Sequence, residues 1–230
     1  MTPKTALIVG AGAGLSASVA RKLAAQGAKG ALAARSLETN SELAETLGGR
    51  AYRCDASEEK DVNALFEAVE EDLGAPDFVL YNSSARAKGP FVELDPGDVE
   101  KAILVSAYGG FLVAQQAAKR MIPAGGGAIF FTGASASVKG YPQSAPFAMG
   151  KFALRGLAQS IARELQPQNI HVAHFVIDGA IRNPGRTEPA ENPDSMLDPD
   201  AIAETYMAVL AQNRSAWTWE IELRPWVERF

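Results

Sequence analysis

The sequence predicts an α/β domain built on a doubly wound parallel sheet. Seven short, mostly apolar runs alternate with longer segments in which apolar residues recur every three or four positions. The short runs predict buried strands, and the longer segments predict amphipathic helices. Strict alternation of the two is typical of parallel strands joined by crossover helices. There is no internal repeat and no interdomain linker, so residues 1–230 are expected to form a single domain.

The apolar patterns also place the individual elements. Strands are expected at 5–9, 31–34, 51–54, 78–81, 128–131, 170–177 and 217–223. Helices are expected at 15–23, 43–47, 62–73, 95–123, 147–165 and 202–210. Asp95 followed by Pro96 has the cap-then-proline form of a helix start. Gly48 and Gly49 close the short second helix.

A glycine-rich turn follows the first expected strand. Gly10-Ala-Gly-Ala-Gly14 stands between that strand and a helix that begins at Leu15. Glycine lets the main chain come close to a pyrophosphate, and the amides at a helix start direct partial positive charge at it. The next strand, 31–34, ends at Arg35 and completes a βαβ unit of the kind that holds a dinucleotide. The expected fold class is therefore a single-domain Rossmann fold with a seven-stranded parallel sheet flanked by helices.

Composition excludes several other classes of protein. A net charge of -5 and a pI near 5.2 argue against a nucleic-acid or anionic-membrane surface. No apolar run approaches the ~20 residues that cross a bilayer. The chain also enters its first strand at once, which predicts no signal peptide. Cys54, the only cysteine, cannot form an internal disulfide, and we expect it to be buried in a cytoplasmic protein. His171 and His174 should face opposite sides of one strand, so no metal site is expected.

At this point the chain resembles the short-chain dehydrogenase/reductase family over 6–223, because five segments agree with it in order and spacing. They are the glycine turn with Ser16 in place of its last glycine, Cys54-Asp55-Ala56, Tyr81-Asn82-Ser83-Ser84, the helix around Lys151, and Ile177-Asp178-Gly179-Ala180-Ile181. The resemblance implies a nicotinamide dinucleotide and a small carbonyl or alcohol substrate. The residues expected to bind this cofactor are Gly10, Gly12, Ala13, Gly14, Leu15, Arg35, Ser36, Asp55, Ala56, Asn82, Ser83, Ser84, Lys151, Gly179 and Ile181.

The same comparison shows where the chain departs from the family. The family's active site is an Asn, a Ser, a Tyr and a Lys, with the tyrosine one helical turn before the lysine. Here those positions hold Ser106, Ala134, Phe147 and Lys151. The family lysine also hydrogen-bonds the nicotinamide ribose, a role that needs no tyrosine, so cofactor binding is expected to persist. Loss of a general acid costs ~10²–10⁴ in rate, so turnover requires another proton donor.

Hydroxyl groups near the vacant positions are the candidates for that donor. Tyr141 is our first choice and Ser135 the second, because both belong to the segment that follows the fifth strand. Ser137 and Tyr108 are further candidates. The alternative for each is a surface or packing role. The expected catalytic residues are therefore Lys151, Tyr141 and Ser135.

The residues after the second strand predict which dinucleotide is bound. NAD-preferring relatives place an acidic residue there, whereas this chain has Arg35 and Ser36. A guanidinium matches a 2′-phosphate, so NADP(H) is expected over NAD(H). The alternative is a solvated arginine stacked on adenine, which would leave the preference open.

Three expectations concern the rest of the molecule. The proline-rich segment 182–199 is expected to cover the substrate, or else to be a variable surface loop. Ala148 and Gly150 lie on the helix that pairs subunits in the family, which is compatible with a homo-oligomer, a dimer or tetramer. The expected function is an NADP-dependent oxidoreductase with an altered proton donor. A catalytically silent NADP(H)-binding sensor, or a partner of an active homologue in a hetero-oligomer, are the alternatives.

Overall fold

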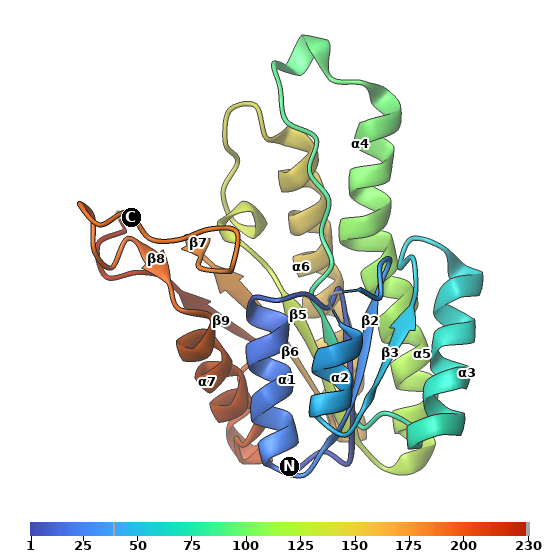
Figure 1. Ribbon diagram of the computed structural model, residues 1–230. Coiled ribbons are helices and arrows are strands. Elements are labelled where there is room, and N and C mark those ends of the chain that lie inside the picture. The colour runs from blue at the N-terminus through green and yellow to red at the C-terminus, as the bar shows by residue number, and fades with distance from the viewer. Residues whose placement is uncertain (39, 229–230) are drawn as a thin grey trace.

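The computed structural model describes residues 1–38 and 40–228 and shows three layers, with helices on both faces of one sheet (Figure 1). Seven parallel strands follow the order β3-β2-β1-β4-β5-β6-β9, which confirms the predicted sheet. The strands are β1 Thr5–Val9, β2 Lys29–Ala34, β3 Arg50–Arg53, β4 Phe78–Tyr81, β5 Gly127–Thr132, β6 Ile170–Ile177 and β9 Glu220–Leu223.

Each face of the sheet has its own apolar core. Side chains alternate along a strand, so Leu7 and Val79 pack toward one set of helices, whereas Ile8 and Phe130 pack toward the other. The first set comprises α3 Glu59–Leu73, α5 Gly109–Ala124 and α6 Ala145–Leu165. The second set comprises α1 Leu15–Ala25, α2 Ser41–Thr46 and α7 Pro199–Leu210. Burial on both faces explains why the central strands are mostly apolar.

The strand order reverses between β1 and β4. β1 pairs with β2 on one side and with β4 on the other. In such sheets the loops at the carboxyl ends of these strands diverge and leave a crevice where ligands bind. The glycine turn after β1 and the segment after β4 lie side by side at this point, as the bond from the Asn82 amide to the Val9 carbonyl shows.

The expected helix over 95–123 is a composite. It begins as α4 Pro96–Ile103, where the Asp95 side chain accepts a bond from the Asp98 amide, as the cap-then-proline pattern predicts. A π-helical turn, Leu104–Tyr108, joins α4 to α5. Such turns insert one residue per helical turn and occur frequently at functional sites. The helix ends at Ala124 rather than at Pro123, followed by Gly125 with a φ of 85°.

Two other expected boundaries were wrong. α6 starts at Ala145, before Phe147, because Pro146 is tolerated in a first helical turn. The last strand starts at Glu220 instead of 217. Trp217 leaves the sheet and stacks on His171, with ring centroids 4.6 Å apart and planes 3° apart.

The segment 182–199 is not a plain loop. Beside it, β7 Ala180–Ile181 pairs with β8 Met196–Leu197 in a small second sheet. Figure 1 shows this pair beyond the ends of β6 and β9. Within the described residues, no helix is both long and apolar enough to cross a membrane.

Candidate functional site: a dinucleotide cleft with an altered substrate end

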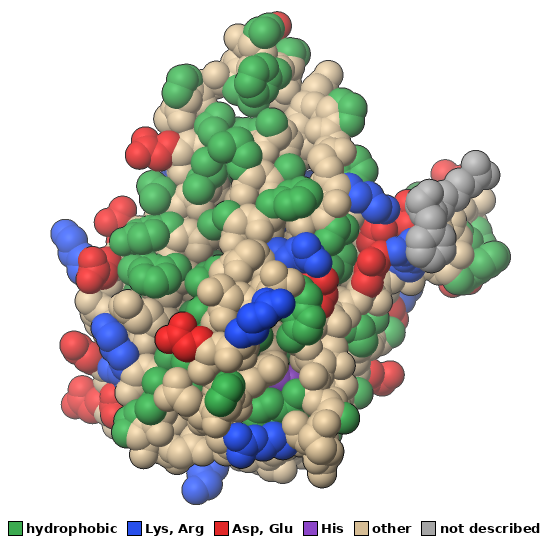
Figure 2. Space-filling view, turned by 180° about the vertical axis from the view of Figure 1, so that it is seen from behind, with side chains coloured by type: hydrophobic (Ala, Val, Ile, Leu, Met, Phe, Trp, Pro, Cys, Tyr) green, Lys and Arg blue, Asp and Glu red, His purple; other side chains and the backbone are tan. Residues whose placement is uncertain are grey.

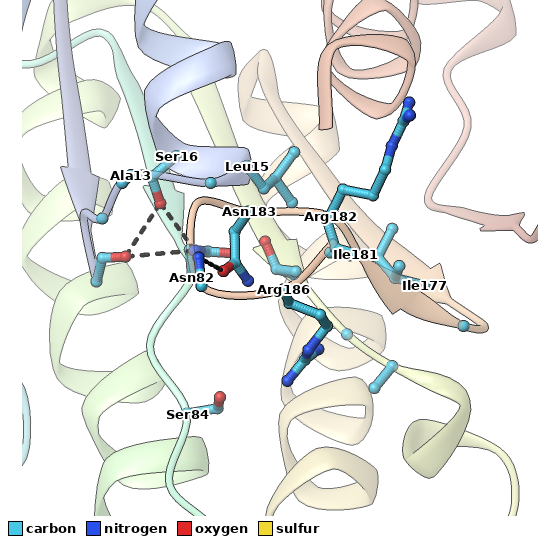
Figure 3. Close-up of a pocket in the computed structure, with 18 of the residues that line it drawn as sticks. Ala13, Leu15, Ser16, Asn82, Ser84, Ile177, Ile181, Arg182, Asn183 and Arg186 are labelled. Atoms are coloured by element: carbon cyan, nitrogen blue, oxygen red, sulfur yellow. Dashed lines mark hydrogen bonds between the residues drawn. The ribbon is translucent and has the colours of Figure 1, made fainter. Parts of the chain in front are cut away.

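The glycine turn is held against the segment after β4. Gly10 has a φ of +85°, and a Cβ there would lie 2.5 Å from the Ser83 amide nitrogen, so only glycine fits. Asn82 Nδ2 donates to Ser16 Oγ at 2.8 Å and to the Gly10 carbonyl at 3.3 Å, and Ser16 Oγ donates to the same carbonyl at 3.0 Å (Figure 3). Ser16 thus stabilises the turn from the position where the family has a glycine.

The start of α1 and the middle of the turn remain open. Gly14 caps α1 without a side-chain hydrogen bond, so the first amides of the helix are available to an anion. No atom lies within 4 Å of the position of a Cβ on Gly12. An anionic group can therefore approach the main chain here without displacing a side chain.

Two adjoining cavities extend from this turn in opposite directions. One, of ≈ 470 Å³, runs toward Lys151 and β7, and the other, of ≈ 370 Å³, runs toward the ends of β2 and β3. All the cofactor-binding residues predicted from the sequence line one or both of them. The fold thus brings these residues together along two adjoining cavities, and their role in cofactor binding stays a prediction.

The cavity beside β2 and β3 contains the residues expected to face an adenosine. Arg35 and Asp55 both line it. The pKa of the Asp55 carboxyl is lowered chiefly by a hydrogen bond from Ser57 Oγ at 2.6 Å, with Arg35 among the further causes. Sequence reasoning missed Asn40, whose buried Nδ2 donates to the Ala11 carbonyl at 3.3 Å while its Oδ1 has no partner among the described residues. An unpaired buried oxygen in a ligand cavity fits a donor on a bound molecule.

Lys151 is buried in the other cavity. Its side chain comes from α6, and Nζ donates to the Thr132 carbonyl at 2.7 Å. Burial, followed by the charge of Arg86, lowers its pKa to about 7. A lysine in this state can hold or release a proton near neutral pH.

Phe147 lies one helical turn before Lys151 and is 6% exposed. The Arg86 guanidinium carbon lies 3.9 Å from the centroid of its ring, and Lys151 Nζ lies 5.9 Å from the same centroid. The ring carries no hydroxyl, so the proton donor of the family is absent from this position. A stacked arginine occupies the space beside it instead.

The vacant serine position, Ala134, is held by a buried polar chain. The Ala134 amide donates to Ser137 Oγ at 3.2 Å, and Ser137 Oγ lies 3.3 Å from His174 Nε2. His174 Nδ1 lies 3.0 Å from Glu220 Oε2, which Arg155 also binds at 2.6 Å. Burial lowers the pKa of His174 to about 4, so it is neutral. Ser137 is completely buried and therefore positions the main chain at Ala134.

The other predicted donors are separated from Lys151. Tyr141 and Ser135 line a third cavity of ≈ 520 Å³, which adjoins the Lys151 cavity. Tyr108 is half exposed and stacks on Phe111 with ring centroids 6.1 Å apart. Ser106, in the asparagine position, is buried and its Oγ accepts a bond from the Ala85 amide at 3.1 Å.

Besides Asn40, four residues of the site were not named from the sequence, although three of them belong to the segment 182–199 that was expected to cover the substrate. Arg182, Asn183 and Arg186 come from the segment after β7, and Arg86 comes from the segment after β4. The Arg182 guanidinium pairs with Asp198. The prolines of 182–199 predicted a covering segment but did not mark these individual side chains, and no sequence signal marks Arg86. Among the described residues, no group of three potential metal ligands occurs.

Known proteins with similar sequences are oxidoreductases. A family model described as enoyl-(acyl carrier protein) reductase matches residues 10–213. D-threitol dehydrogenase of Mycolicibacterium smegmatis is 30% identical over 174 residues, which are 74% of this chain and 67% of that one. Mouse 3-oxoacyl-[acyl-carrier-protein] reductase is 29% identical over 181 residues, which are 78% of this chain and 76% of that one.

Solved structures give the same result. A short-chain dehydrogenase from Rhodopseudomonas palustris is 35% identical with a TM-score of 0.82, covering 96% of this chain and 98% of that one. An alcohol dehydrogenase from Thermococcus sibiricus, complexed with 5-hydroxy-NADP, has the same fold, with a TM-score of 0.88, 24% identity and coverage of 98% of each chain. With the glycine turn, the Lys151 helix and the matched length together, the chain belongs to the short-chain dehydrogenase/reductase family of oxidoreductases.

Proposed function

We propose that this protein is an NADP(H)-dependent oxidoreductase that interconverts a small carbonyl compound and its alcohol. The observation that carries the proposal is the line of adjoining cavities from Arg35, across the open glycine turn, to the buried Lys151. Solved relatives support it, since the Thermococcus sibiricus enzyme and a metagenomic short-chain oxidoreductase are described with NADP-type ligands.

The residues present fit such a cofactor. The turn is open at Gly12, the α1 start is uncapped, and Asn40 Oδ1 has no partner. When bound, NADPH would supply the hydride. Gly12 to Leu15 would hold its pyrophosphate through main-chain amides. Arg35 and Ser36 would bind the 2′-phosphate, which is our reason for preferring NADP(H) over NAD(H).

Lys151 would orient the nicotinamide end and tune the proton supply. Its ammonium already donates to the Thr132 carbonyl and has further donors to offer. Tyr141 and Ser135 stay our proposed sources of the proton, now from the adjoining cavity, which a substrate entering beside Phe147 would reach. The segment 182–199 would cover the site and limit access of water, because Asn183 already lies against Gly14.

One observation favours a second candidate. Phe147 and Ala134 remove both hydroxyls on which the family route depends, so a catalytically silent NADP(H)-binding protein is the alternative. Such a protein would bind NADPH in the same cavities without turnover, as a sensor or as a partner of an active homologue.

We also propose that the protein forms a homo-oligomer. Large apolar side chains are exposed on the helical face formed by α5, α6 and the π turn (Figure 2), namely Tyr108, Phe111, Ile122, Met149 and Phe152. Isolated monomers rarely expose so many large apolar groups together. Sedimentation velocity that gives only a monomer at micromolar concentration would reject this part of the proposal.

The test of function has two readouts. First, melting temperature is measured with increasing NADPH or NADH, and we expect a larger rise with NADPH. Second, NADPH oxidation is followed with a panel of ketones, aldehydes and oxo acids. Binding with turnover supports the oxidoreductase, binding without turnover on the panel supports the silent alternative, and no binding of either dinucleotide rejects both.

A further inference from the structure

Two arginines stand at the junction between the Lys151 cavity and the outer cavity that contains Tyr141. Arg86 follows β4 and Arg186 follows β7, and both residues line both cavities. The glycine turn lines only the inner of the two cavities, and Tyr141 only the outer. The arginines therefore lie on the substrate side of the cleft.

No described residue neutralises either guanidinium. Within residues 1–38 and 40–228, neither Arg86 nor Arg186 has a side-chain hydrogen bond or an ion pair. Nearby cations differ, since Arg182 pairs with Asp198 and Arg155 pairs with Glu220. The pKa of Arg86 is lowered first by burial and then by the charge of Arg186, so the two cations repel each other across the opening.

The acids at this end do not cancel these charges. Asp178 lines the outer cavity, but its carboxylate pairs with Lys139 at 3.2 Å and lies 3.8 Å from Arg224. Glu228 also lines the outer cavity but not the inner one. The junction itself therefore holds two arginines, with Lys151 behind them.

The Phe147 ring fixes one of the two arginines. Arg86 stacks on the ring with its guanidinium carbon 3.9 Å from the centroid, which limits the rotation of the side chain and leaves its N–H edge free. Lys151 lies against the same ring at 5.9 Å. A substrate with its carbonyl beside Lys151 would therefore extend past this ring toward Arg86.

The Arg186 side chain points away from the glycine turn, as Figure 3 shows. Arg186 extends away from Ala13 and Ser16, whereas Arg182 extends the opposite way, toward its partner Asp198. The amides that would hold a pyrophosphate lie at the glycine turn. The glycine-turn amides and the Arg186 guanidinium therefore stand at different parts of the same cavity.

We propose that Arg86 and Arg186 bind a carboxylate on the substrate, so that the protein acts on oxo acids and hydroxy acids rather than on neutral carbonyl compounds. The inference rests on the proposed oxidoreductase function. Guanidinium groups bind carboxylates through paired N–H donors, and two unpaired cations in a half-enclosed opening favour an anion over a neutral ester of the same shape.

The test compares each acid with its own methyl ester. Pyruvate and methyl pyruvate, and levulinate and methyl levulinate, are assayed with saturating NADPH. We expect kcat/KM for one or both acids to exceed that for the ester by about tenfold or more. Arg86→Met and Arg186→Met should each lower kcat/KM for the acid by roughly tenfold to a hundredfold, mainly through KM, with the NADPH Kd unchanged. Arg186→Met should leave the ester unchanged, whereas Arg86→Met should lower kcat/KM for the acid much more than for the ester, because Arg86 also lowers the pKa of Lys151. Arg163→Met removes an exposed positive charge from α6 and serves as the control.

Each outcome decides a different question. The inference is overturned if kcat/KM for both esters equals or exceeds that for the acids. It is also overturned if Arg186→Met weakens NADPH binding but keeps the preference for the acid. If the protein binds NADPH but turns over neither acids nor esters, titration calorimetry of levulinate into the NADP⁺-saturated protein gives the answer. Levulinate binding that both Arg→Met variants abolish supports the carboxylate site while the proposed turnover fails, and no binding to the wild-type protein rejects the site.

Discussion

The cofactor end and the substrate end of the cleft differ in what builds them. At the cofactor end, the ligand surface is largely main chain, set by the open glycine turn and by the uncapped start of α1. At the substrate end, the surface is made of side chains from three separate segments, represented by Arg86, Phe147 and Arg186. The glycine turn is a motif of five consecutive residues and can be recognised in the sequence. The opening is lined by loops far apart in the sequence, so no contiguous motif predicts it.

The two ends also differ in how far they follow their family. The cofactor end keeps its expected pattern, and even Ser16 in place of a glycine is used, since its hydroxyl stabilises the turn. At the substrate end, the positions of the hydroxyl donors are filled by Phe147 and Ala134, and cations stand nearby. A change of substrate chemistry with retention of the dinucleotide would produce this contrast.

The largest expected effect comes from the residue that joins the two ends. Lys151→Met should lower turnover by ~10²–10⁴ and also weaken NADPH binding, because it removes a donor to the cofactor and the ionisable group beside the carbonyl. Steady-state kinetics and calorimetry measure the two effects separately. Lys119→Met, an exposed lysine on α5, is the control. Unchanged turnover would show that the substrate end works without Lys151.

The buried Lys151 also makes stability depend on pH. Its pKa is about 7 in the fold and 10.5 in the reference state, so between these values the unfolded chain binds more protons and stability rises with pH. Below pH 7 the fold carries the full cost of the buried charge, of the order of a few kcal/mol. Without cofactor, the melting temperature of Lys151→Met should therefore exceed that of the wild type most at pH 6. The difference should disappear toward pH 10. A pH-independent difference in melting temperature would contradict the lowered pKa.

Restoring the family hydroxyls tests whether the substrate end is altered or closed. Phe147→Tyr with Ala134→Ser should create or raise ketone reduction, by up to ~10². The new phenol would lie one turn from Lys151, and the new serine would face the same opening. Reduction of neutral ketones by the double variant is the measurement. A double variant that binds NADPH and stays inert would indicate that the opening itself excludes such substrates, which favours the silent alternative.

At the cofactor end, a single charge should set the choice of dinucleotide. Arg35 is exposed and lines the cavity beside β2 and β3. Arg35→Asp should therefore leave the fold intact and raise the NADPH Kd by about tenfold or more. The NADH Kd should change far less. Equal loss for both dinucleotides would mean that Arg35 does not read the 2′-phosphate.

These predictions reflect how much of the molecule the sequence specifies. The sheet, its parallel pairing and its crevice follow from apolar periodicity, since buried central strands such as β4 and β5 consist almost entirely of apolar residues. The start of β9 did not follow. Trp217 alternates with its neighbours like a strand residue, but it lies outside the sheet and stacks on His171. The π turn at Leu104–Tyr108 did not follow either, since one inserted residue leaves the apolar stripe nearly unchanged.

The same distinction applies to the side chains of the site. Lys151 was predictable because its helix carries a recognisable pattern. Arg86 and Arg186 were not, because their importance depends on lacking partners, and only the fold reveals which of several arginines are paired. Asn40 is similar, since its unpaired oxygen is visible only once Ala11 is placed beside it.

The smallest expected effect concerns the proton donor. Tyr141→Phe keeps the ring and removes the hydroxyl, and we expect about a tenfold fall in turnover with unchanged NADPH affinity. The structure places Tyr141 in the outer cavity, 44% exposed, so its hydroxyl must reach the carbonyl past Phe147 while water competes for the same role. That competition is why the effect should be smaller than the loss of Lys151. Ser135→Ala, from the same cavity, is the matched comparison. If both variants keep full turnover, neither Tyr141 nor Ser135 is the required proton donor, and Tyr108, a bound water or Lys151 itself is the next source to test.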